Sequence, residues 1–397
     1  MQLTRSVLWV VVIILVAGVG VTRFLANDET VSAPGGDFES NSRLAELLGS
    51  QRFEGFPLAT APRVFSFPED HGPHPEYRNE WWYLTGNLDD QDGQRFGYEL
   101  TIFRFSLVPS PPGDSGNAMS SAWKTNQVYV AHFAITDEAE NKFYVEQKYS
   151  RGAMGLAGAQ ANPFKVWIDN WSIQENPGEV MDSQSQEAWE LSASGDGFSL
   201  MLNLVSMKPP VLNGTAGLSR KSSEAGNASY YYSIPRLHSE GSLQIGGSAH
   251  SVRGLSWLDR EWSSSALAAD QQGWDWFALQ LSDGSDLMFY NIRKTDGGQD
   301  RYSAGTFIFA DGKSQHLDND DVTLTVTDQW QSPRGVFYPA RWNIELPDFD
   351  LRLSVSPVIP NQELITTVRY WEGAVDVVGR RKEQELTGRG YVELTGY

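Results

Sequence analysis

The sequence predicts an all-β protein made of two similar units. Aromatic residues form 12% of the chain, and 37 of its 397 residues are glycine, a mixture that suits strands joined by tight turns better than helices. Short segments of alternating or continuous apolar character recur along the chain, and turn signals separate them. The second half repeats the pattern of the first, as expected for one β unit that was duplicated and then diverged.

An apolar run at residues 7–21, flanked by Arg5 and Arg23, precedes the β body and predicts one N-terminal hydrophobic helix. A membrane span needs about 20 apolar residues and a signal-peptide core has roughly 7–15, so the run is near the limit of both. Residues 1–26 are therefore expected to be a signal peptide or a membrane anchor, followed by a polar linker at residues 27–55. Both interpretations predict export, to the periplasm or another extracytoplasmic space, and an anchor would make the membrane a partner.

Composition excludes several classes of function. The net charge of −19 argues against nucleic acid as a partner, because phosphate backbones need a basic face. The chain has no cysteine, which excludes disulfides, thiol catalysis and cysteine-ligated metals. We expect no cofactor and no metal.

Five segments have the clearest strand character: residues 81–88, 96–105, 127–136, 142–150 and 198–207. Hairpin turns are predicted at residues 92–93, 195–197, 283–284 and 311–312, where Asp-Gly or Gly-Asp-Gly occurs. Closed antiparallel barrels and β-sandwiches both fit this pattern. Aromatic alternation on both strand faces favours barrels.

The two halves match in detail. Residues 80–104 (EWWYLTGNLDDQDGQRFGYELTIFR) parallel residues 275–294 (DWFALQLSDGSDLMFYNIRK): a Trp-led strand, a turn, and an aromatic strand that ends in a basic residue. A Gly/Ser/Asn-rich stretch at residues 211–229 separates the halves. We therefore expect an N-terminal domain at residues 56–228 and a C-terminal domain at residues 229–397, with residues 254–262 as an early strand of the second.

Several longer motifs are specific when taken together: FPEDHGPHPEYRNEWWYLTGNL, YELTIFRF, GLSWLDREWSSS with GWDWFALQL, and YWEGAVDVVG with GRGYVELTGY. With them the chain resembles the carotenoid 1,2-hydratase/AttH (CrtC-like) family, whose members are often labelled predicted secreted hydrolases. The resemblance covers nearly the whole body. It implies two lipocalin-like barrels packed together and a pocket for an elongated apolar molecule. It also implies acid-catalysed addition of water to carbon–carbon double bonds, or folding of a polyene for cyclisation.

The stretch GLSWLDREW, residues 254–262, carries the candidate acid. Alternation along a strand places Trp257, Asp259 and Glu261 on one face. The resemblance implies that Asp259 is the proton donor. Burial against tryptophan raises the pKa of a carboxyl group, which an acid needs if it is to protonate an alkene near neutral pH. In the hydratases a histidine precedes this aspartate. Here the corresponding region holds Tyr230–Tyr232, and His238 does not match the position of that histidine.

Structural alternatives stand beside these roles. Asp259 can pair with an arginine or cap backbone amides at a strand end. Glu261 can act with Asp259 as a general acid/base pair, or it can form a salt bridge to Arg293 or Arg104.

Aromatic side chains near these motifs are candidates for binding the ligand: Trp82, Tyr83, Tyr230, Tyr232, Trp274 and Trp276. A polar loop with His71, His74 and Glu80 is a further candidate site. Its histidines have the types that ligate zinc, but Gly and Pro make the loop irregular, so we expect it to plug one end of a barrel instead. Glu80 is expected to pair with Arg78 or Arg104.

The function predicted from the sequence is binding of an elongated lipid- or isoprenoid-like ligand, with hydration or isomerisation of a C=C bond through Asp259. The first alternative is a non-catalytic carrier or export accessory protein, which would give the chain an ABC-type exporter as a partner. The second is a secreted hydrolase, although the chain lacks a G-x-S-x-G elbow and residues 263–265 are serines without an evident His/Asp pair.

Overall fold

The computed structural model describes residues 55–109, 125–176, 187–265 and 267–397. Nearly all regular structure in these ranges is β, apart from three short 3₁₀ turns, η1 (Glu69–His71), η2 (Asn319–Asp321) and η3 (Pro347–Phe349). The all-β prediction is confirmed. The expected N-terminal helix and nearly all of the expected linker lie outside the described residues, among which no helix is long and apolar enough to cross a membrane.

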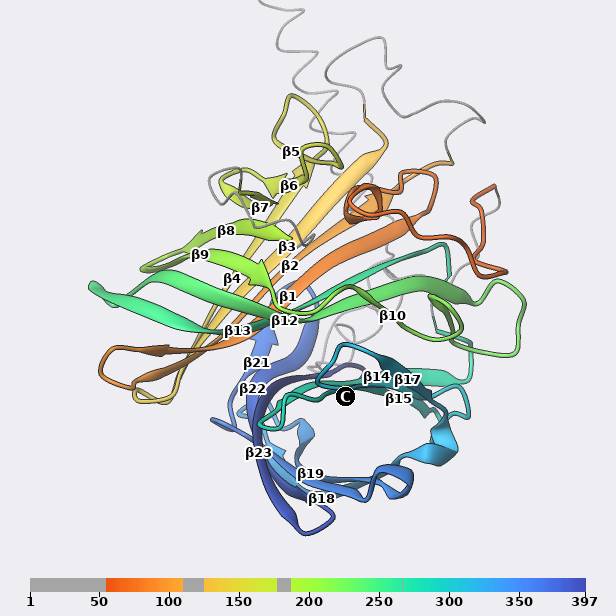
Figure 1. Cartoon of the computed structure of the whole chain (residues 1–397). Coiled ribbons are helices and arrows are strands. Elements are labelled where there is room, and N and C mark those ends of the chain that lie inside the picture. The colour runs from red at the N-terminus through yellow and green to blue at the C-terminus, as the bar shows by residue number, and fades with distance from the viewer. Residues whose placement is uncertain (1–54, 110–124, 177–186, 266) are drawn as a thin grey trace, which may run out of the picture. The chain divides into compact units, whose positions relative to one another are not determined.

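Two antiparallel sheets curl into barrel-like forms (Figure 1). The first contains β1 (Asn79–Asp90), β2 (Arg95–Ser106), β3 (Gln127–Asp137), β4 (Lys142–Arg151), β5 (Ala157–Gln160), β6 (Lys165–Ile168), β7 (Trp171–Glu175), β8 (Ala188–Gly195), β9 (Phe198–Ser206), β10 (Val211–Leu212), β11 (Leu218–Arg220), β12 (Ala228–Ile245) and β13 (Ser248–Ser263). The second contains β14 (Gln271–Leu281), β15 (Asp286–Lys294), β16 (Ala304–Ile308), β17 (Ser314–Leu317), β18 (Thr323–Gln331), β19 (Phe337–Leu346), β20 (Leu351–Pro357), β21 (Glu363–Ile365), β22 (Arg369–Arg381) and β23 (Gln384–Leu394). All five segments with the clearest predicted strand character form strands.

The two sheets share one strand order. In the first it is β4-β3-β2-β1-β13-β12-β9-β8-β7, continuing to β6 and β5, and in the second it is β17-β16-β15-β14-β23-β22-β20-β19-β18. In both, the first strand of the unit pairs with its last long strand, β1 with β13 and β14 with β23. The match in topology agrees with duplication of one β unit.

The chain changes sheets later than the sequence suggested. Both β12 and β13 belong to the first sheet, so the change falls between Ser263 and Gln271 rather than after residue 228. The Gly/Ser-rich stretch at residues 211–229 contains β10 and β11, which pair with β12 and belong to the first sheet. Residues 254–262 therefore lie in the middle of the first sheet, between β1 and β12, and not in the second.

Predicted turns join neighbouring strands. Asp-Gly at residues 92–93 links β1 to β2, and Asp-Gly at residues 283–284 links β14 to β15. Gly93 and Gly284 have φ of 81° and 83°, left-handed values that glycine adopts without steric cost.

Three large hydrophobic clusters, and a small one around Leu364, Val368 and Tyr370, are buried among the described residues. One fills the interior of the first sheet and includes Trp82 and Trp262, and a second fills the second sheet and includes Trp342. The third lies in the seam between the sheets, where Tyr83 of β1 packs against Trp276 of β14 with ring centroids 5.1 Å apart. Because neighbouring residues of β1 face opposite sides, Trp82 enters the first barrel while Tyr83 enters the seam.

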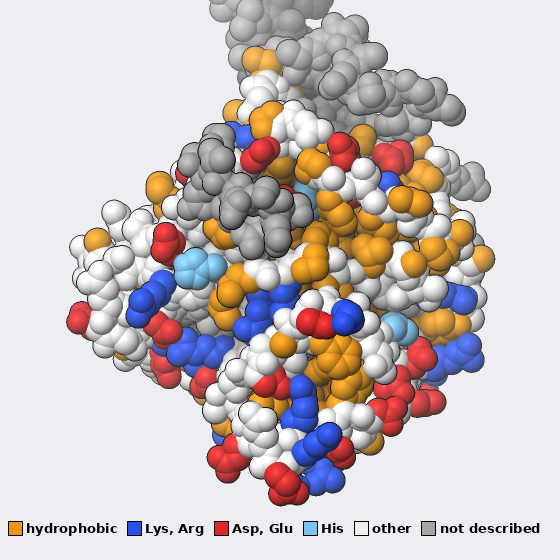
Figure 2. Space-filling model, in the orientation of Figure 1, with side chains coloured by type: hydrophobic (Ala, Val, Ile, Leu, Met, Phe, Trp, Pro, Cys, Tyr) orange, Lys and Arg blue, Asp and Glu red, His pale blue; other side chains and the backbone are white. Residues whose placement is uncertain are grey.

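Polar contacts also join the two sheets. Asp286 of β15 accepts hydrogen bonds from Lys208 and Arg236, both at 2.7 Å, and its side chain is fully buried. Gly97 of β2 lies so close to β22 that a Cβ atom there would be 2.6 Å from the Cβ of Ala374. On the visible face, hydrophobic side chains gather over the first sheet, whereas charged side chains crowd the surface of the second (Figure 2).

Candidate active site

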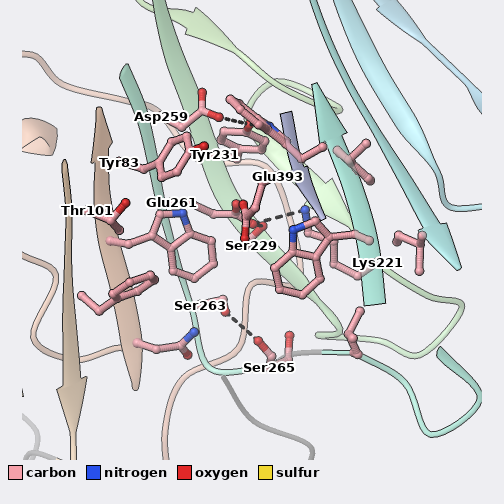
Figure 3. A pocket seen from close by; sticks show the side chains of 18 of the residues that line it. Tyr83, Thr101, Lys221, Ser229, Tyr231, Asp259, Glu261, Ser263, Ser265 and Glu393 are labelled. Carbon is pink, nitrogen blue, oxygen red and sulfur yellow. Dashed lines mark hydrogen bonds and ion pairs between the residues drawn. The ribbon is translucent and has the colours of Figure 1, made fainter. Parts of the chain in front are cut away.

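A cavity opens in the seam between the two sheets rather than inside either barrel. The cavity has a volume of about 120 Å³. One water molecule needs roughly 10–15 Å³ of such volume, so the cavity has room for a small organic molecule. It is lined by Asn79, Trp81, Tyr83, Thr101, Phe103, Lys221, Ala228, Ser229, Tyr231, Asp259, Glu261, Ser263, Ser265, Leu267, Trp274, Trp276, Tyr290, Ile292, Tyr370, Glu372 and Glu393 (Figure 3). Aromatic rings and carboxyl groups dominate this set.

Asp259 of β13 is buried in the cavity wall and accepts three hydrogen bonds. Its Oδ1 accepts from the Ser233 hydroxyl and from the indole N–H of Trp257 at 2.7 Å. Its Oδ2 accepts from the Tyr231 hydroxyl at 2.5 Å, and Tyr231 in turn accepts from the indole N–H of Trp276 at 3.1 Å. No arginine or lysine pairs with Asp259 among the described residues, so the arginine-pair alternative is not realised.

Burial raises the pKa of Asp259 from 3.8 to about 7. The hydrogen bonds from Ser233, Tyr231 and Trp257 oppose the rise because they stabilise the anion, while the nearby Glu261 adds to it. A carboxyl group with this pKa is substantially protonated at neutral pH, as a general acid must be.

Glu261 lies on the same face of β13, as the alternation predicted, and lines the same cavity. Its partners are Lys221, at 3.2 Å between Nζ and Oε1, and the hydroxyl of Ser229. The expected salt bridge to Arg293 or Arg104 does not form, because Arg293 pairs with Asp275 and Arg104 with Glu80.

Two further carboxyl groups, which the sequence did not single out, line the cavity from the second sheet. Glu372 of β22 and Glu393 of β23 are directly opposite each other in the antiparallel pairing. Burial, with the charges of Asp259 and Glu261 adding to it, raises the pKa of Glu393 to about 8. Burial and the charges of Glu99 and Glu393 raise the pKa of Glu372 well above its ordinary value.

Only some of the predicted aromatic residues reach the cavity. Tyr83, Trp274 and Trp276 line it. Trp82, Tyr230 and Tyr232 belong instead to the interior of the first barrel. They lie on the opposite strand face and do not line this cavity, so a role in binding a ligand there is not supported.

The polar loop is held by a buried ion-pair network. The carboxylate of Glu80 accepts from Arg104 and Arg260 and from the backbone N–H of His74, and the charges of the two arginines hold its pKa low although burial opposes them. Nδ1 of His71 lies 2.6 Å from the Tyr232 hydroxyl, so the loop packs against the core of the first barrel.

The His74 ring stacks on Trp262 with centroids 3.7 Å apart. Within the described ranges no three His, Cys, Asp or Glu side chains are arranged to hold a metal ion. The loop does not contribute to the cavity lining.

The serines at residues 263–265 do not form a catalytic triad in the described part of the chain. Ser263 donates to the Ser265 backbone carbonyl at 2.8 Å, and Ser265 is held by the backbone of Ala228. His238 is half exposed and lies 3.8 Å from Glu240. Tyr231, and not a histidine, contacts the carboxyl of Asp259.

Fold and site together define a protein of two lipocalin-like barrels with an acid-containing, aromatic-lined cavity in the seam between them. The AttH-like family model matches residues 58–397, and the chain belongs to this family. A crystal structure of an AttH protein from Nitrosomonas europaea is 32% identical, with a TM-score of 0.72, and the match covers 85% of this chain and 99% of that one.

Two more distant relatives have names that refer to water chemistry. The crystal structure of kievitone hydratase from Nectria haematococca has a TM-score of 0.63 at 15% identity, over 86% of this chain and 97% of that one, which shows a shared fold. The dehydratase asqC of Emericella nidulans is 24% identical over 200 residues, 47% of this chain. The match spans 54% of that relative's length.

Proposed function

We propose that this protein catalyses the addition of water to a carbon–carbon double bond of an apolar small molecule, or the reverse dehydration, with Asp259 as the acid. The observation that carries the proposal is a buried carboxyl group, with a pKa raised by burial to about 7, in the wall of an aromatic-lined cavity. Alkene protonation requires an acid of this kind, held away from bulk water.

The hydrogen bonds of Asp259 locate the reactive proton. Oδ1 already accepts from Ser233 and Trp257, whereas Oδ2 accepts only from Tyr231. The acidic proton therefore resides on the second lone pair of Oδ2.

The proposed reaction balances without a further reactant. The π electrons of the substrate take the proton from Asp259, which leaves a carbocation and a carboxylate. A water oxygen then bonds to the cation and releases its extra proton to the carboxylate. The aromatic rings of Tyr83 and Trp276 line the same cavity, and an aromatic ring face stabilises positive charge through its quadrupole.

The comparisons support the class of reaction through a hydratase of the same fold and a dehydratase of partial sequence similarity. The apolar nature of the ligand is supported by the lining side chains, among them Trp81, Phe103, Leu267 and Ile292. Carotenoid hydration is one variant of the proposal, although Tyr231 stands where the resemblance implied a histidine.

The test compares the wild-type protein with Asp259→Asn on a panel of terpenoid and prenylated aromatic alkenes, with mass spectrometry for the gain or loss of one water. We expect turnover to fall by a factor on the order of 10²–10⁴, the usual contribution of a general acid. Asp196→Asn, at an exposed turn, is the matched control and should leave turnover unchanged. Equal turnover by wild type and Asp259→Asn would refute the role of Asp259.

A carrier function is the second candidate, because the cavity is suited to an apolar ligand whether or not chemistry follows. Mass spectrometry of molecules that copurify with the protein would favour this function if it finds a ligand that is bound and never altered. Export and a role beside a transporter remain proposals that rest on the apolar run at residues 7–21. Cell fractionation of the full chain and of a chain lacking residues 1–26 tests the export.

A further inference from the structure

Four polar groups converge on one part of the cavity from both sheets. Tyr83 of β1 and Thr101 of β2 stand directly opposite each other in the first sheet, and Glu372 and Glu393 do so in the second. All four line the cavity, and Figure 3 shows Tyr83, Thr101 and Glu393 around the same space.

The two hydroxyl groups are buried and have no geometric hydrogen-bond partner. Tyr83 is 6% exposed and Thr101 is 1% exposed, yet neither Oη of Tyr83 nor Oγ1 of Thr101 completes a hydrogen bond within the described residues. Neither oxygen of Glu372, which is 1% exposed, completes a hydrogen bond of ordinary geometry, although the hydroxyl groups of Tyr83 and Tyr370 lie close enough to lower its pKa. A buried polar group without a partner costs about 1–3 kcal/mol, so a ligand that supplies one gains affinity.

A hydrogen-bonded chain behind the cavity orients a donor toward Glu372. The side-chain amide of Gln147 donates to Nε2 of His132 at 2.7 Å, so Nδ1 carries the ring proton and donates to Oη of Tyr370 at 2.5 Å. The Gln147 carbonyl accepts from the backbone N–H of Thr367 at 3.2 Å, which fixes the amide orientation. The Tyr370 proton is then free to point at Glu372, whose pKa it lowers against the larger effect of burial.

We propose that these groups form a subsite for one neutral oxygen of the ligand, a hydroxyl or a carbonyl. The natural ligand is then an apolar body with an oxygen substituent, and not a pure hydrocarbon. An anionic head group is disfavoured, because it would add a negative charge beside the buried carboxyl groups of Glu372 and Glu393, and the cation Lys221 is engaged with Glu261. The inference rests on the proposed function in one respect, that the seam cavity is where the substrate binds.

Three probes with the same carbon skeleton length test the subsite: geraniol, the hydrocarbon myrcene, and geranic acid. Binding is followed by tryptophan fluorescence, since Trp81, Trp274 and Trp276 line the cavity. We expect geraniol to bind about 30-fold more tightly than myrcene, as two hydrogen bonds of about 1 kcal/mol net each would give, and more tightly than geranic acid at pH 7.5.

The double variant Tyr83→Phe with Thr101→Val removes the two hydroxyl groups and nothing else. It should reduce the preference for geraniol over myrcene to less than about 3-fold. Its thermal stability should change little, because neither hydroxyl completes a hydrogen bond of ordinary geometry, although Tyr83 lies close enough to Glu372, and Thr101 to Glu99, to lower the pKa of each carboxyl group. Thr325→Val, on the exposed strand β18, is the control and should keep the wild-type preference.

The outcomes separate this subsite from the proposed function. Equal affinity of the wild type for geraniol and myrcene, or tighter binding of geranic acid, overturns the subsite and leaves Asp259 catalysis standing. A double variant that retains the full preference also overturns it. Failure of all three probes to bind overturns the subsite and the assignment of the cavity as the ligand site together, whereas loss of Asp259-dependent turnover alone leaves the subsite intact.

Discussion

The burial of Asp259 predicts a pH-dependent cost to folding that replacement by asparagine removes. Its pKa is about 7 in the folded protein, against 3.8 for an unburied group. Because the folded-state pKa is raised, the protonated carboxyl contributes its full stability below pH about 4, and the contribution is lost as the pH rises through about 7. Asp259→Asn is neutral at every pH, so the variant does not show this loss.

The magnitude follows from the interval between the two pKa values. Between pH 5 and the folded-state pKa of about 7 lie about 2 pH units, and each unit changes the free energy of unfolding by about 1.36 kcal/mol. From pH 5 to pH 9 the free energy of unfolding of the wild type therefore falls by about 3 kcal/mol relative to the variant. Asparagine can still accept from Ser233 and Trp257 through its one carbonyl oxygen, as Oδ1 of Asp259 does. Tyr231 must then accept from the new amide instead of donating.

Urea unfolding followed by tryptophan fluorescence at several pH values between 5 and 9 measures the effect. The free energy of unfolding of Asp259→Asn minus that of the wild type should rise with pH and level off above pH about 7. Asp196→Asn should give a flat difference, since Asp196 is exposed. A flat difference for Asp259→Asn as well would show that the carboxyl is not held protonated by burial, and the acid role would lose its physical basis.

Two further predictions concern the scaffold. Glu80→Gln leaves Arg104 and Arg260 buried without their countercharge and should lower the free energy of unfolding by about 3–5 kcal/mol, and an unchanged thermal midpoint would contradict this. Gly97→Ala forces a methyl group against Ala374 and should cost about 1–3 kcal/mol in urea unfolding. Ala374→Gly in the same chain should restore part of that loss, and no recovery would mean that the two strands do not meet there.

Strand alternation predicted one half of the site well. It placed Asp259 and Glu261 together on one face of a strand, and both line the cavity. It did not show that Trp82 and Tyr232 lie outside the cavity, because both faces of β1 and β12 are apolar in sequence: one meets the interior of its own barrel and the other meets the second sheet. Periodicity separates the two faces but does not say which of them lies in the seam.

The carboxyl groups of the second sheet were overlooked for a different reason. Glu372 and Glu393 have apolar or glycine neighbours on both sides, in YWEGAVDV and YVELTGY, and only the pairing of β22 with β23 makes them neighbours. Each lies far along the chain from Asp259. A lone acid inside an otherwise apolar strand is the signal that was available, since a buried charge is costly unless its surroundings keep it neutral or paired.

The shared strand order of the two sheets has a consequence for how such a site can change. Trp81 and Trp276 are equivalent in the two units, and the residues opposite them are Glu261 and Glu393. In a symmetric dimer of identical units, these two positions would have the same residue and the same surroundings. Two units joined in one chain are free of that constraint: Glu261 has Lys221 within 3.2 Å, whereas the pKa of Glu393 is raised to about 8. Covalent linkage has allowed one ancestral position to become a salt-bridged carboxylate on one wall and a carboxylic acid on the other.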